Sequence, residues 1–488
     1  MKYDILIIGS GLGGLECGAI LSRQGKSVLV LEQQHQPGGC MQSYKRKGVT
    51  FDTGLHYVGG LDEGQPLHTT FKYLGLLDLP WQRLDSNGFD RIYLPHSPEF
   101  RFAEGYAEFV NVMAEHFPKE KQALQEYVDL LRKADDDQLT AIISPTPPEL
   151  SLTNRLFSTN AWEWLHEHFN DELLINVLSG TSLKMELHKE TLPLFTFLHG
   201  NSSFIQSSWR LKGDGNMLVE HLVESIKRNG GKVICNSKVT ELQEDNSKIK
   251  YALCSNGERY EAETFISNLH PAVTCQLVKD STLIKGIYRK RMTRLENTFG
   301  MFTVSIKLRE GSIPYFNHNK FIYDTLNVWN LSESDNDGKG ILISCPTNGN
   351  QIDILMPMLW EECIPWTETT IAHRGAEYEA FKARKTEQCL ALAEQQIPEL
   401  RGSIEAIYTS TPLTYCDYNN TPNGSAYGIR KDAAMPMMTI LTPRTPVPNL
   451  LMTGQNLMLH GLHGVTMTSL FTCAEILGKE QIKLMIQD

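Results

Sequence analysis

The stretch YDILIIGSGLGGLECGAILSRQGKSVLVLE, residues 3–32, decides the fold of this chain. Residues 3–9 are a short apolar run rich in isoleucine, which is typical of a strand buried on both faces. The glycine-rich turn and residues 10–25 predict a helix, and residues 26–32 predict a second buried strand. A strand, a helix and a second strand in this order predict an α/β domain with a parallel sheet.

The turn after the first strand carries a pattern that binds phosphates. Gly9, Gly11 and Gly14 form G-x-G-x-x-G, with Leu12 and Gly13 between them. The pattern alone is weak, but its position between a strand and a helix indicates a dinucleotide site. The first glycine permits the tight turn, the second lets the backbone approach a pyrophosphate, and the third lets the helix pack against the strand. The helix N-terminus then presents free N–H groups to the phosphates.

The residues after the second strand indicate which dinucleotide binds. Glu32 ends that strand, 18 residues after Gly14, where its carboxylate can accept hydrogen bonds from ribose hydroxyls. An acid at this place repels a 2′-phosphate, so NADP is not expected here. A second glycine turn, GGCMQSY at residues 38–44, follows after a short gap. It suggests that the ligand continues along the protein, which favours FAD over NAD.

Composition limits the class of protein. The 488 residues carry a formal net charge of −11, which argues against a nucleic-acid partner. The ten cysteines are scattered without a C-x-x-C pair, so neither a disulfide framework nor a metal site is expected. The N-terminus enters a strand at once, and no run approaches the ~18 apolar residues that span a bilayer. We expect a cytoplasmic protein, with peripheral membrane contact left open.

The rest of the chain alternates between two kinds of region. Residues 119–139 are an amphipathic helix by pattern, SPTPPEL at 144–150 resembles a linker, and residues 160–180 predict a further helix. The α/β pattern then returns, with a helix over 218–228 and a final strand, glycine-rich loop and helix near the C-terminus. The predicted fold is a discontinuous Rossmann-like FAD-binding domain with an inserted α+β substrate domain. The FAD-binding domain is expected in residues 1–65, 205–275 and 411–488, and the substrate domain in residues 66–204 and 276–410.

Five motifs together resemble a known family. They are GSGLGG, LEQQHQPGGC, FDTGLHYVGG, FISNLHP and GQNLMLHGLHGV. The combination is similar to the flavin oxidoreductases of the phytoene desaturase group. Within that group, GGC followed by FDTGLHYVGG most resembles the retinol saturase branch, and carotenoid cis-trans isomerases are close relatives. About the first 60 and the last 40 residues carry most of the resemblance.

The resemblance implies a set of cofactor contacts. Gly38 and Gly39 would lie against FAD, and the segment that begins at Phe51 would lie beside the flavin. The backbone at Val239 would reach the adenine side. The turn at Gly454 would sit near the pyrophosphate and ribityl chain. The backbone at Gly464 and Val465 would contact the isoalloxazine, where a helix N-terminus stabilises negative charge on the reduced ring.

The resemblance also places candidate catalytic residues. His56, His460 and His463 would lie near the flavin, and we rank His56 first, although a lone histidine is more often structural. Tyr427 is a second candidate proton donor, with Tyr57 beside it as a further alternative. Cys40 stands where amine-oxidase relatives often have Arg or Lys, which weakens an amine-oxidase assignment. Its thiol is expected to pack against the cofactor.

The predicted activity is redox chemistry on C=C or C–C bonds of an apolar polyene or isoprenoid. Hydride exchange at the flavin allows reduction, desaturation or isomerisation of such a substrate, and the retinol saturase-like segment favours reduction. The alternatives are a carotenoid desaturase or isomerase, then a flavin amine oxidase, and outside enzymes a prenyl-binding protein on the same fold. No second G-x-G-x-x-G follows a strand. The electron donor is therefore either NAD(P)H that binds transiently or another redox protein.

Overall fold

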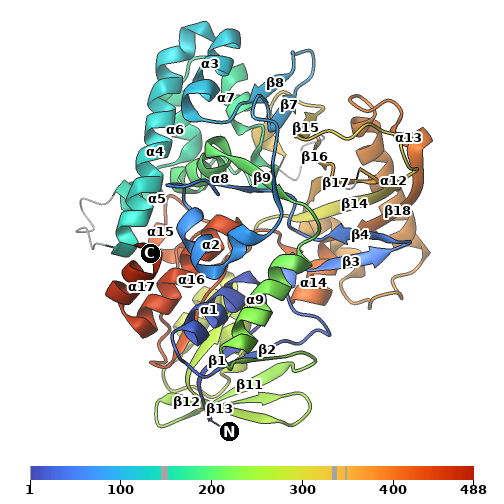
Figure 1. The fold of residues 1–488 in the computed structure, drawn as a ribbon. Helices are drawn as coiled ribbons and strands as arrows, with labels where there is room; N and C mark the ends of the chain where they lie inside the picture. Colours follow the sequence, from blue (N-terminus) through green and yellow to red (C-terminus); the bar gives the residue numbers. More distant parts are fainter. Residues whose placement is uncertain (1, 144–151, 332–337, 347–348, 488) are drawn as a thin grey trace.

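The computed structural model describes residues 2–143, 152–331, 338–346 and 349–487. The linker predicted at 144–150 lies outside them. Two seven-stranded sheets and a layer of helices make up the described part (Figure 1). The sheet that contains the N-terminal strand lies at the bottom of that view, and the second sheet lies at the right.

The first sheet has the order β10-β2-β1-β13-β12-β11, with β19 also paired to β13. Strands β1, β2, β10, β13 and β19 run parallel to one another, while β12 pairs antiparallel with β13 and with β11. The α/β fold class with a parallel sheet is therefore confirmed. The strands are β1 (Lys2–Ile8), β2 (Val28–Leu31), β10 (Lys232–Ile234), β11 (Val239–Asp245), β12 (Lys248–Cys254), β13 (Arg259–Ser267) and β19 (Leu450–Met452).

Apolar side chains cover both faces of this sheet, as the continuous apolar runs predict. In β1, Ile5 and Ile7 point into a core shared with the helices, whereas Leu6 and Ile8 point into a second core under β11–β13. The helices on the first face pack on one another, with α1 against both α9 and α16. They are α1 (Leu12–Arg23), α2 (His68–Leu74), α9 (Asn216–Arg228), α16 (Gly461–Leu477) and α17 (Lys479–Gln487), and α10 (Pro271–Leu277) follows β13.

The second sheet is mostly antiparallel and has the order β18-β14-β17-β16-β15-β7-β8. Only the pair β15–β7 is parallel in it among the described strands. Helix α12 packs on four of its strands. Its elements are β7 (Asp90–Tyr93), β8 (Phe100–Phe102), β14 (Gly300–Leu308), β15 (Asn319–Tyr323), β16 (Gly340–Ser344), β17 (Gln351–Met358), β18 (Ile404–Ser410), α12 (Ala376–Ala393), α13 (Leu400–Ser403) and α14 (Pro412–Asn419).

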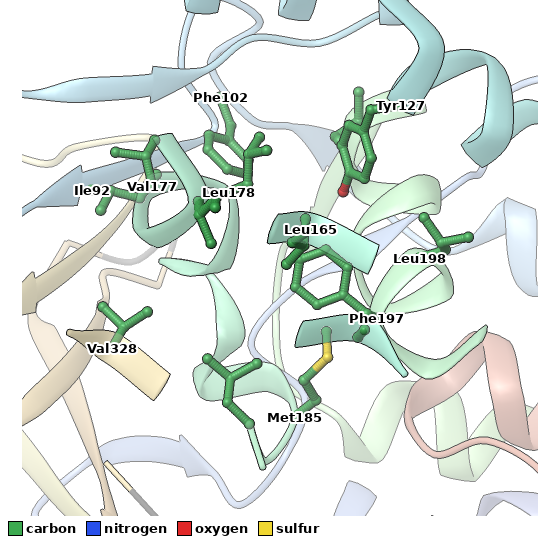
Figure 2. Close-up of a cluster of buried hydrophobic side chains, with 14 of the residues drawn as sticks. Ile92, Phe102, Tyr127, Leu165, Val177, Leu178, Met185, Phe197, Leu198 and Val328 are labelled. Atoms are coloured by element: carbon green, nitrogen blue, oxygen red, sulfur yellow. The ribbon is translucent and has the colours of Figure 1, made fainter. Parts of the chain in front are cut away.

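A layer of helices packs beside the second sheet. Side chains from the helices and from this sheet form one hydrophobic core between them. Figure 2 shows part of that core, where Tyr127, Leu165 and Phe197 come from three different helices and Met185 approaches from the loop below them. The helices are α3 (Tyr106–His116), α4 (Lys121–Ile143), α5 (Leu152–Ser158), α6 (Ala161–His168), α7 (Glu172–Ser179), α8 (Leu194–Gln206) and the 3-10 helix η5 (Ser182–Lys184).

Local sequence signals predict most of these helices but miss one break. The amphipathic pattern over 119–139 is confirmed as α4, and the helix predicted over 218–228 is confirmed as α9. The single helix predicted over 160–180 is wrong, because the chain forms α6 and then α7. The Asp171 carboxylate accepts hydrogen bonds from the N–H groups of Leu173 and Leu174, which starts a new helix there.

Two small sheets connect the large ones near the stretch FDTGLHYVGG. Strands β3 (Ser43–Arg46) and β4 (Val49–Asp52) form a hairpin, and β5 (Val58–Gly59), β9 (Ser208–Leu211) and β6 (Trp81–Arg83) form a three-stranded sheet. Gly59 packs so closely on α8 that an added Cβ would stand 2.4 Å from the backbone N of Phe204. This stretch therefore runs between the first sheet and the helical layer. The boundaries of the two predicted domains stay a prediction.

None of the described helices combines the length and the apolar character that crossing a membrane requires.

Candidate active site

A cavity of about 680 Å³ extends from the first glycine turn to the helical layer. Its volume is in the range of ligand sites in proteins. Most of the predicted site residues line it: Gly9, Gly11, Leu12, Gly13, Glu32, Gly38, Gly39, Cys40, His56, Val239, Tyr427, Gly454 and Val465. Gly14 and Gly464 do not. The structure thus brings most of the residues predicted from separate motifs around one space.

Gly14 and Gly464 lie behind the residues that line the cavity. The absence of a side chain at each position permits close backbone packing there. A Cβ on Gly14 would stand 2.2 Å from the carbonyl oxygen of Gly9, and a Cβ on Gly464 would stand 2.5 Å from the carbonyl of Leu459. Both contacts are far shorter than a van der Waals contact, so a side chain at either position would force the backbones apart. Gly14 therefore has the packing role that its place in the motif predicts.

The N-terminus of α1 opens onto the cavity as an anion site. Gly11 is its N-cap, no side chain caps the helix, and no acidic residue lies in its first turn. The first N–H groups of a helix have no intrahelical partner, so they are free for a phosphate, and the helix dipole favours negative charge there. Gly39 comes so close to this turn that its Cβ would stand 3.0 Å from the Cα of Gly11.

Glu32 connects the two glycine turns. Its Oε2 accepts hydrogen bonds from the N–H and the hydroxyl of Ser10, at 3.0 and 2.6 Å, and its Oε1 accepts one from the N–H of Gln34. The N–H of Gly38 in turn donates to the carbonyl of Ser10. A carboxylate has about four acceptor positions. Glu32 therefore keeps acceptor capacity on Oε1 for a ribose hydroxyl.

A second helix N-terminus faces the cavity at α16. The N-cap is His460, which makes no capping hydrogen bond, and the first turn holds no acidic residue. Gly461, Leu462 and His463 of that turn line the cavity. The positive end of the helix dipole therefore lies at the wall, where it would stabilise negative charge on a bound ring.

The three predicted histidines gather at the cavity wall in neutral form. Burial lowers the pKa of His56, His460 and His463 to about 4 in each case, and the charge of Arg210 adds to the effect at His56. Nε2 of His56 is buried without a hydrogen-bond partner among the described residues. A neutral imidazole is a poor proton donor at neutral pH. The role of His56 as a proton donor stays a prediction.

Tyr427 and Cys40 also line the cavity with constrained side chains. The Tyr427 hydroxyl donates a hydrogen bond to the carbonyl of Leu183, and its ring contacts that of His460 at 4.5 Å between centroids, with an interplanar angle of 33°. Burial raises the pKa of Tyr427 far above its usual value. Burial also raises the pKa of the Cys40 thiol to about 11, so the thiol stays protonated. This state agrees with the expected packing role of Cys40.

Sequence patterns named only one member, Tyr57, of a buried polar cluster at the far wall. The cluster consists of Lys184, Asp90, Tyr57 and Asn319, and Lys184 and Tyr57 line the cavity. The Tyr57 hydroxyl and the Asn319 amide donate to the Asp90 carboxylate at 2.9 and 2.8 Å. Lys184 and Asp90 lie 94 residues apart in the sequence. No local motif contains both, so only the fold reveals the pair.

The arrangement fits a dinucleotide that continues into a ring system. A helix N-terminus stands where a pyrophosphate would lie, a carboxylate with spare acceptor capacity stands beside it, and a second helix N-terminus faces the remaining space. Among the described residues, no cluster of His, Cys, Asp and Glu could hold a metal ion.

Comparisons with known proteins agree with this geometry. A family model described as an NAD(P)-binding Rossmann-like domain matches residues 7–74. The chain is similar to all-trans-retinol 13,14-reductase from Danio rerio, with 25% identity over 99% of this chain and 87% of the relative. It is also similar to prolycopene isomerase 1 from an Oncidium hybrid, with 24% identity over 55% of this chain and 48% of the relative.

Solved structures share the fold over nearly the whole chain. An oxidoreductase from Methanosarcina mazei aligns with a TM-score of 0.63 and 16% identity, over 96% of this chain and 98% of its own. Putrescine oxidase bound to putrescine gives 0.62 and 16%, over 98% and 99%. A Rab GDI from Plasmodium falciparum gives 0.53 and 14%, over 98% of each chain. The comparisons confirm the predicted resemblance and fold class, and they support an enzyme with a dinucleotide-binding domain.

Proposed function

We propose that this chain is an FAD-dependent reductase that saturates a C=C bond in an apolar polyene. The observation that carries the proposal is the similarity to all-trans-retinol 13,14-reductase, which extends over 99% of the chain. The cavity supports it independently, because one continuous space joins a dinucleotide site to an apolar chamber.

The site offers a place for each part of FAD. The α1 N-terminus would hold the pyrophosphate, Glu32 the ribose, and the backbone near Val239 the adenine. The α16 N-terminus would face the isoalloxazine. When bound and reduced, FAD supplies a hydride from N5 of that ring.

The substrate would lie in the apolar half of the cavity. The side chains there come from the helical layer, the second sheet and the C-terminal loops: Leu183, Phe204, Met301, Leu342, Leu355, Tyr415, Ala426 and Leu459. Such a wall excludes water and binds an elongated hydrocarbon through its apolar surface. Reducing equivalents would come from NAD(P)H in a transient encounter or from a redox partner protein.

A redox-neutral polyene isomerase is the second candidate. The similarity to prolycopene isomerase 1 favours it, but that similarity covers 55% of the chain rather than nearly all of it. The Rab GDI comparison gives a non-enzyme candidate, a prenyl-binding protein on the same fold. The intact phosphate turn with Glu32 favours cofactor binding, and therefore an enzyme.

The absorbance spectrum of the purified protein tests the cofactor assignment. We expect flavin bands from the isolated protein, or uptake of FAD by the apoprotein with a matching change in flavin fluorescence. Failure to bind FAD under both conditions would contradict the reductase and the isomerase together.

An exposed apolar patch on the protein surface suggests how an apolar substrate arrives. Ile287 of α11 (Gly286–Arg294) is 81% exposed, and Met437 of α15 (Pro436–Thr439) is 84% exposed. The Arg291 guanidinium donates to the carbonyl oxygens of Met437 and Met438, which holds the two elements together. Exposed apolar side chains in such a group indicate an interaction surface.

Basic side chains surround these apolar side chains and indicate the charge of the surface to which the patch binds. Lys279, Lys285, Lys290 and Arg294 are exposed near the patch, and Arg289 and Arg291 lie on the same helix. The acids nearby are Asp280, Glu296, Asp432 and Glu244, and Glu244 accepts hydrogen bonds from Ser281 and Thr282. A local excess of positive charge in a chain of net charge −11 complements an anionic surface. Apolar residues flanked by Lys and Arg are typical of binding to anionic bilayers. We therefore propose that this patch docks on a membrane containing anionic lipid.

Met437→Asp should weaken binding to phosphatidylserine-containing vesicles about tenfold, because a charge replaces an apolar contact worth roughly 1–2 kcal/mol. Co-sedimentation with vesicles, with and without phosphatidylserine, measures the change. Leu326→Asp is the matched control, since Leu326 is 50% exposed on a loop outside the patch. Equal binding of Met437→Asp and the unmodified protein to these vesicles would contradict the proposed membrane-binding surface. It would leave the reductase proposal unchanged.

A further inference from the structure

Saturating a C=C bond requires a proton donor at the cavity wall as well as a hydride. Among the described residues, five histidines line the cavity. Burial lowers the pKa of His56, His270, His460 and His463 to about 4, so these four are neutral at neutral pH. The fifth, His199, has its Nδ1 3.0 Å from Oδ1 of Asp135. The Tyr427 hydroxyl donates its hydrogen bond to the carbonyl of Leu183. A proton donor must therefore be sought among the other groups that line the cavity.

Lys184 is a cationic side chain in the apolar half of the cavity. It ends the 3-10 helix η5, lines the cavity, and its side chain is only 11% exposed. Its Nζ lies 4.1 Å from the ring centroid of Phe204 and 5.7 Å from that of Tyr57, both of which are cavity residues. An ammonium has three N–H donors. Aromatic faces attract it electrostatically, so the side chain is held near the space a polyene would fill.

Asp90, which does not itself line the cavity, holds the Lys184 ammonium in place through its carboxylate. Its Oδ2 lies 3.5 Å from Nζ of Lys184 and accepts the hydrogen bond from the Tyr57 hydroxyl, and the Asn319 amide donates to Oδ1. Asp90 is fully buried at the start of β7. Two hydrogen bonds stabilise its carboxylate even when Lys184 is neutral, so the loss of a proton from Lys184 does not leave an unsolvated anion.

The backbone around Lys184 is fixed by the residues expected beside the flavin. The carbonyl of Lys184 is 2.9 Å from Nε2 of His460, the N-cap of α16, and the carbonyl of Leu183 accepts from Tyr427. Met185, the next residue, is anchored in the hydrophobic core shown in Figure 2. The position of the ammonium is therefore set by rigid packing rather than by a free loop.

Resting on the proposed function, we propose that Lys184 is the catalytic residue that protonates the substrate, with Asp90 and Tyr57 as positioning residues. Saturation breaks the π bond and forms two C–H bonds. One carbon takes the hydride supplied by reduced flavin, and the other takes a proton from the Lys184 ammonium. The two electrons come from the reduced flavin, which an external two-electron donor such as NAD(P)H regenerates. The neutral amine of Lys184 regains its proton from water.

The environment of Lys184 suits an acid that works near neutral pH. Burial lowers the pKa of Lys184 to about 8, while the charge of Asp90 opposes that shift. Burial raises the pKa of Asp90, and the Lys184 charge opposes that change in turn. Lys184 therefore carries its proton below about pH 8 and loses it above. A general acid is most effective when its pKa lies near the working pH.

The titration of Lys184 can be measured without any turnover. Competitive labelling with acetic anhydride between about pH 6 and pH 10, read by peptide mass spectrometry, reports the fraction of neutral amine at each lysine. We expect Lys184 to become reactive at lower pH than Lys212, an exposed lysine outside the cavity. In Asp90→Asn, the midpoint for Lys184 should fall further, because the charge that raises its pKa is gone. Labelling of Lys184 indistinguishable from that of Lys212 would overturn the proposal.

The kinetic test uses holoprotein with reduced flavin and a polyene that the unmodified protein saturates. Lys184→Met should slow flavin reoxidation by that polyene about 100-fold or more, the usual contribution of a general acid. Lys184→Arg keeps the charge and the ion pair but holds its proton too tightly to donate it, so it should stay slow. Lys212→Met should behave like the unmodified protein, and flavin content and thermal melting check that each variant folds.

The pH dependence separates a chemical role from a structural one. In the unmodified protein the rate should fall as pH rises through about 8, and in Asp90→Asn this fall should begin at lower pH. Full rescue by Lys184→Arg, or loss of the pH dependence in His56→Ala with its retention in Lys184→Met, would overturn the proposal. If the unmodified protein saturates no polyene, the proposed function fails instead, and the labelling result still decides how Lys184 titrates.

Discussion

Gly11→Val should yield folded protein without bound flavin. Gly11 lines the cavity at the N-terminus of α1, and its φ of −63° is one that valine adopts without strain. The new Cβ would stand 2.9 Å from Nδ2 of Asn268, and the two methyl groups would occupy the space where the helix N–H groups meet a phosphate. The substitution should therefore block the pyrophosphate while the strand and helix remain intact.

Flavin absorbance per protein, before and after reconstitution with FAD, measures this effect. Gly402→Val is the matched control, because an added Cβ at Gly402 of α13 meets no atom within 4 Å. Circular dichroism of both variants shows whether the fold is kept. Flavin content in Gly11→Val equal to that of the control would contradict the placement of the pyrophosphate at this turn.

Glu186→Ala should lower the free energy of unfolding by about 3 kcal/mol, because it removes the acceptor of the buried Phe299 N–H and the buried partner of the partly exposed Arg430 guanidinium. The Glu186 side chain is only 2% exposed and accepts from Nε and Nη2 of Arg430, at 2.7 and 3.1 Å. It also accepts from the backbone N–H of Phe299. These bonds join the segment that carries Lys184 to two other parts of the chain. One is the segment at Arg430, which precedes β19, and the other is Phe299, which directly precedes β14.

Urea denaturation followed by circular dichroism measures the change. Glu475→Ala is the control, since its ion pair with Arg444 lies at the surface, where the arginine side chain is 75% exposed. Removing an exposed pair costs roughly 0–1 kcal/mol. Equal losses from the two substitutions would show that Glu186 does not organise the wall of the cavity.

The dinucleotide half of the site could be predicted because its signals are local. Gly9, Gly11 and Gly14 lie within six consecutive residues, between a strand and a helix whose own composition predicts them. Glu32 follows at the end of the next strand. The loop geometry depends on neighbours in sequence, so a short motif contains most of the information.

Of the proposed Lys184 site, only Tyr57 was predicted, because tertiary packing brings the other residues to it. Lys184 ends a single 3-10 turn, Asp90 starts an edge-proximal strand of the second sheet, and Asn319 starts β15 beside it. Each of these residues is ordinary in its own segment. The histidines of FDTGLHYVGG and HGLHGV were predicted to lie near the flavin as candidate catalytic residues because they stand in glycine-rich motifs. Burial lowers their pKa values and keeps them neutral.

The fold itself departs from local prediction where a cap or a pairing decides. The break between α6 and α7 depends on one capping side chain, Asp171, within an otherwise helical pattern. The antiparallel strands β11 and β12 extend a sheet whose other strands are parallel, and a hairpin rather than a crossover joins them. Apolar periodicity does not distinguish these two kinds of connection.

The most direct test of the reductase assignment is the mass of a polyene after anaerobic contact with the reduced holoprotein. The substrates offered are a panel of retinoids and carotenoids. We predict that at least one polyene of the panel reoxidises the flavin, seen as the return of its absorbance, and that its product is two hydrogens heavier than the substrate. A product of unchanged mass would show an isomerase, and no flavin reoxidation by any polyene of the panel would contradict the reductase assignment.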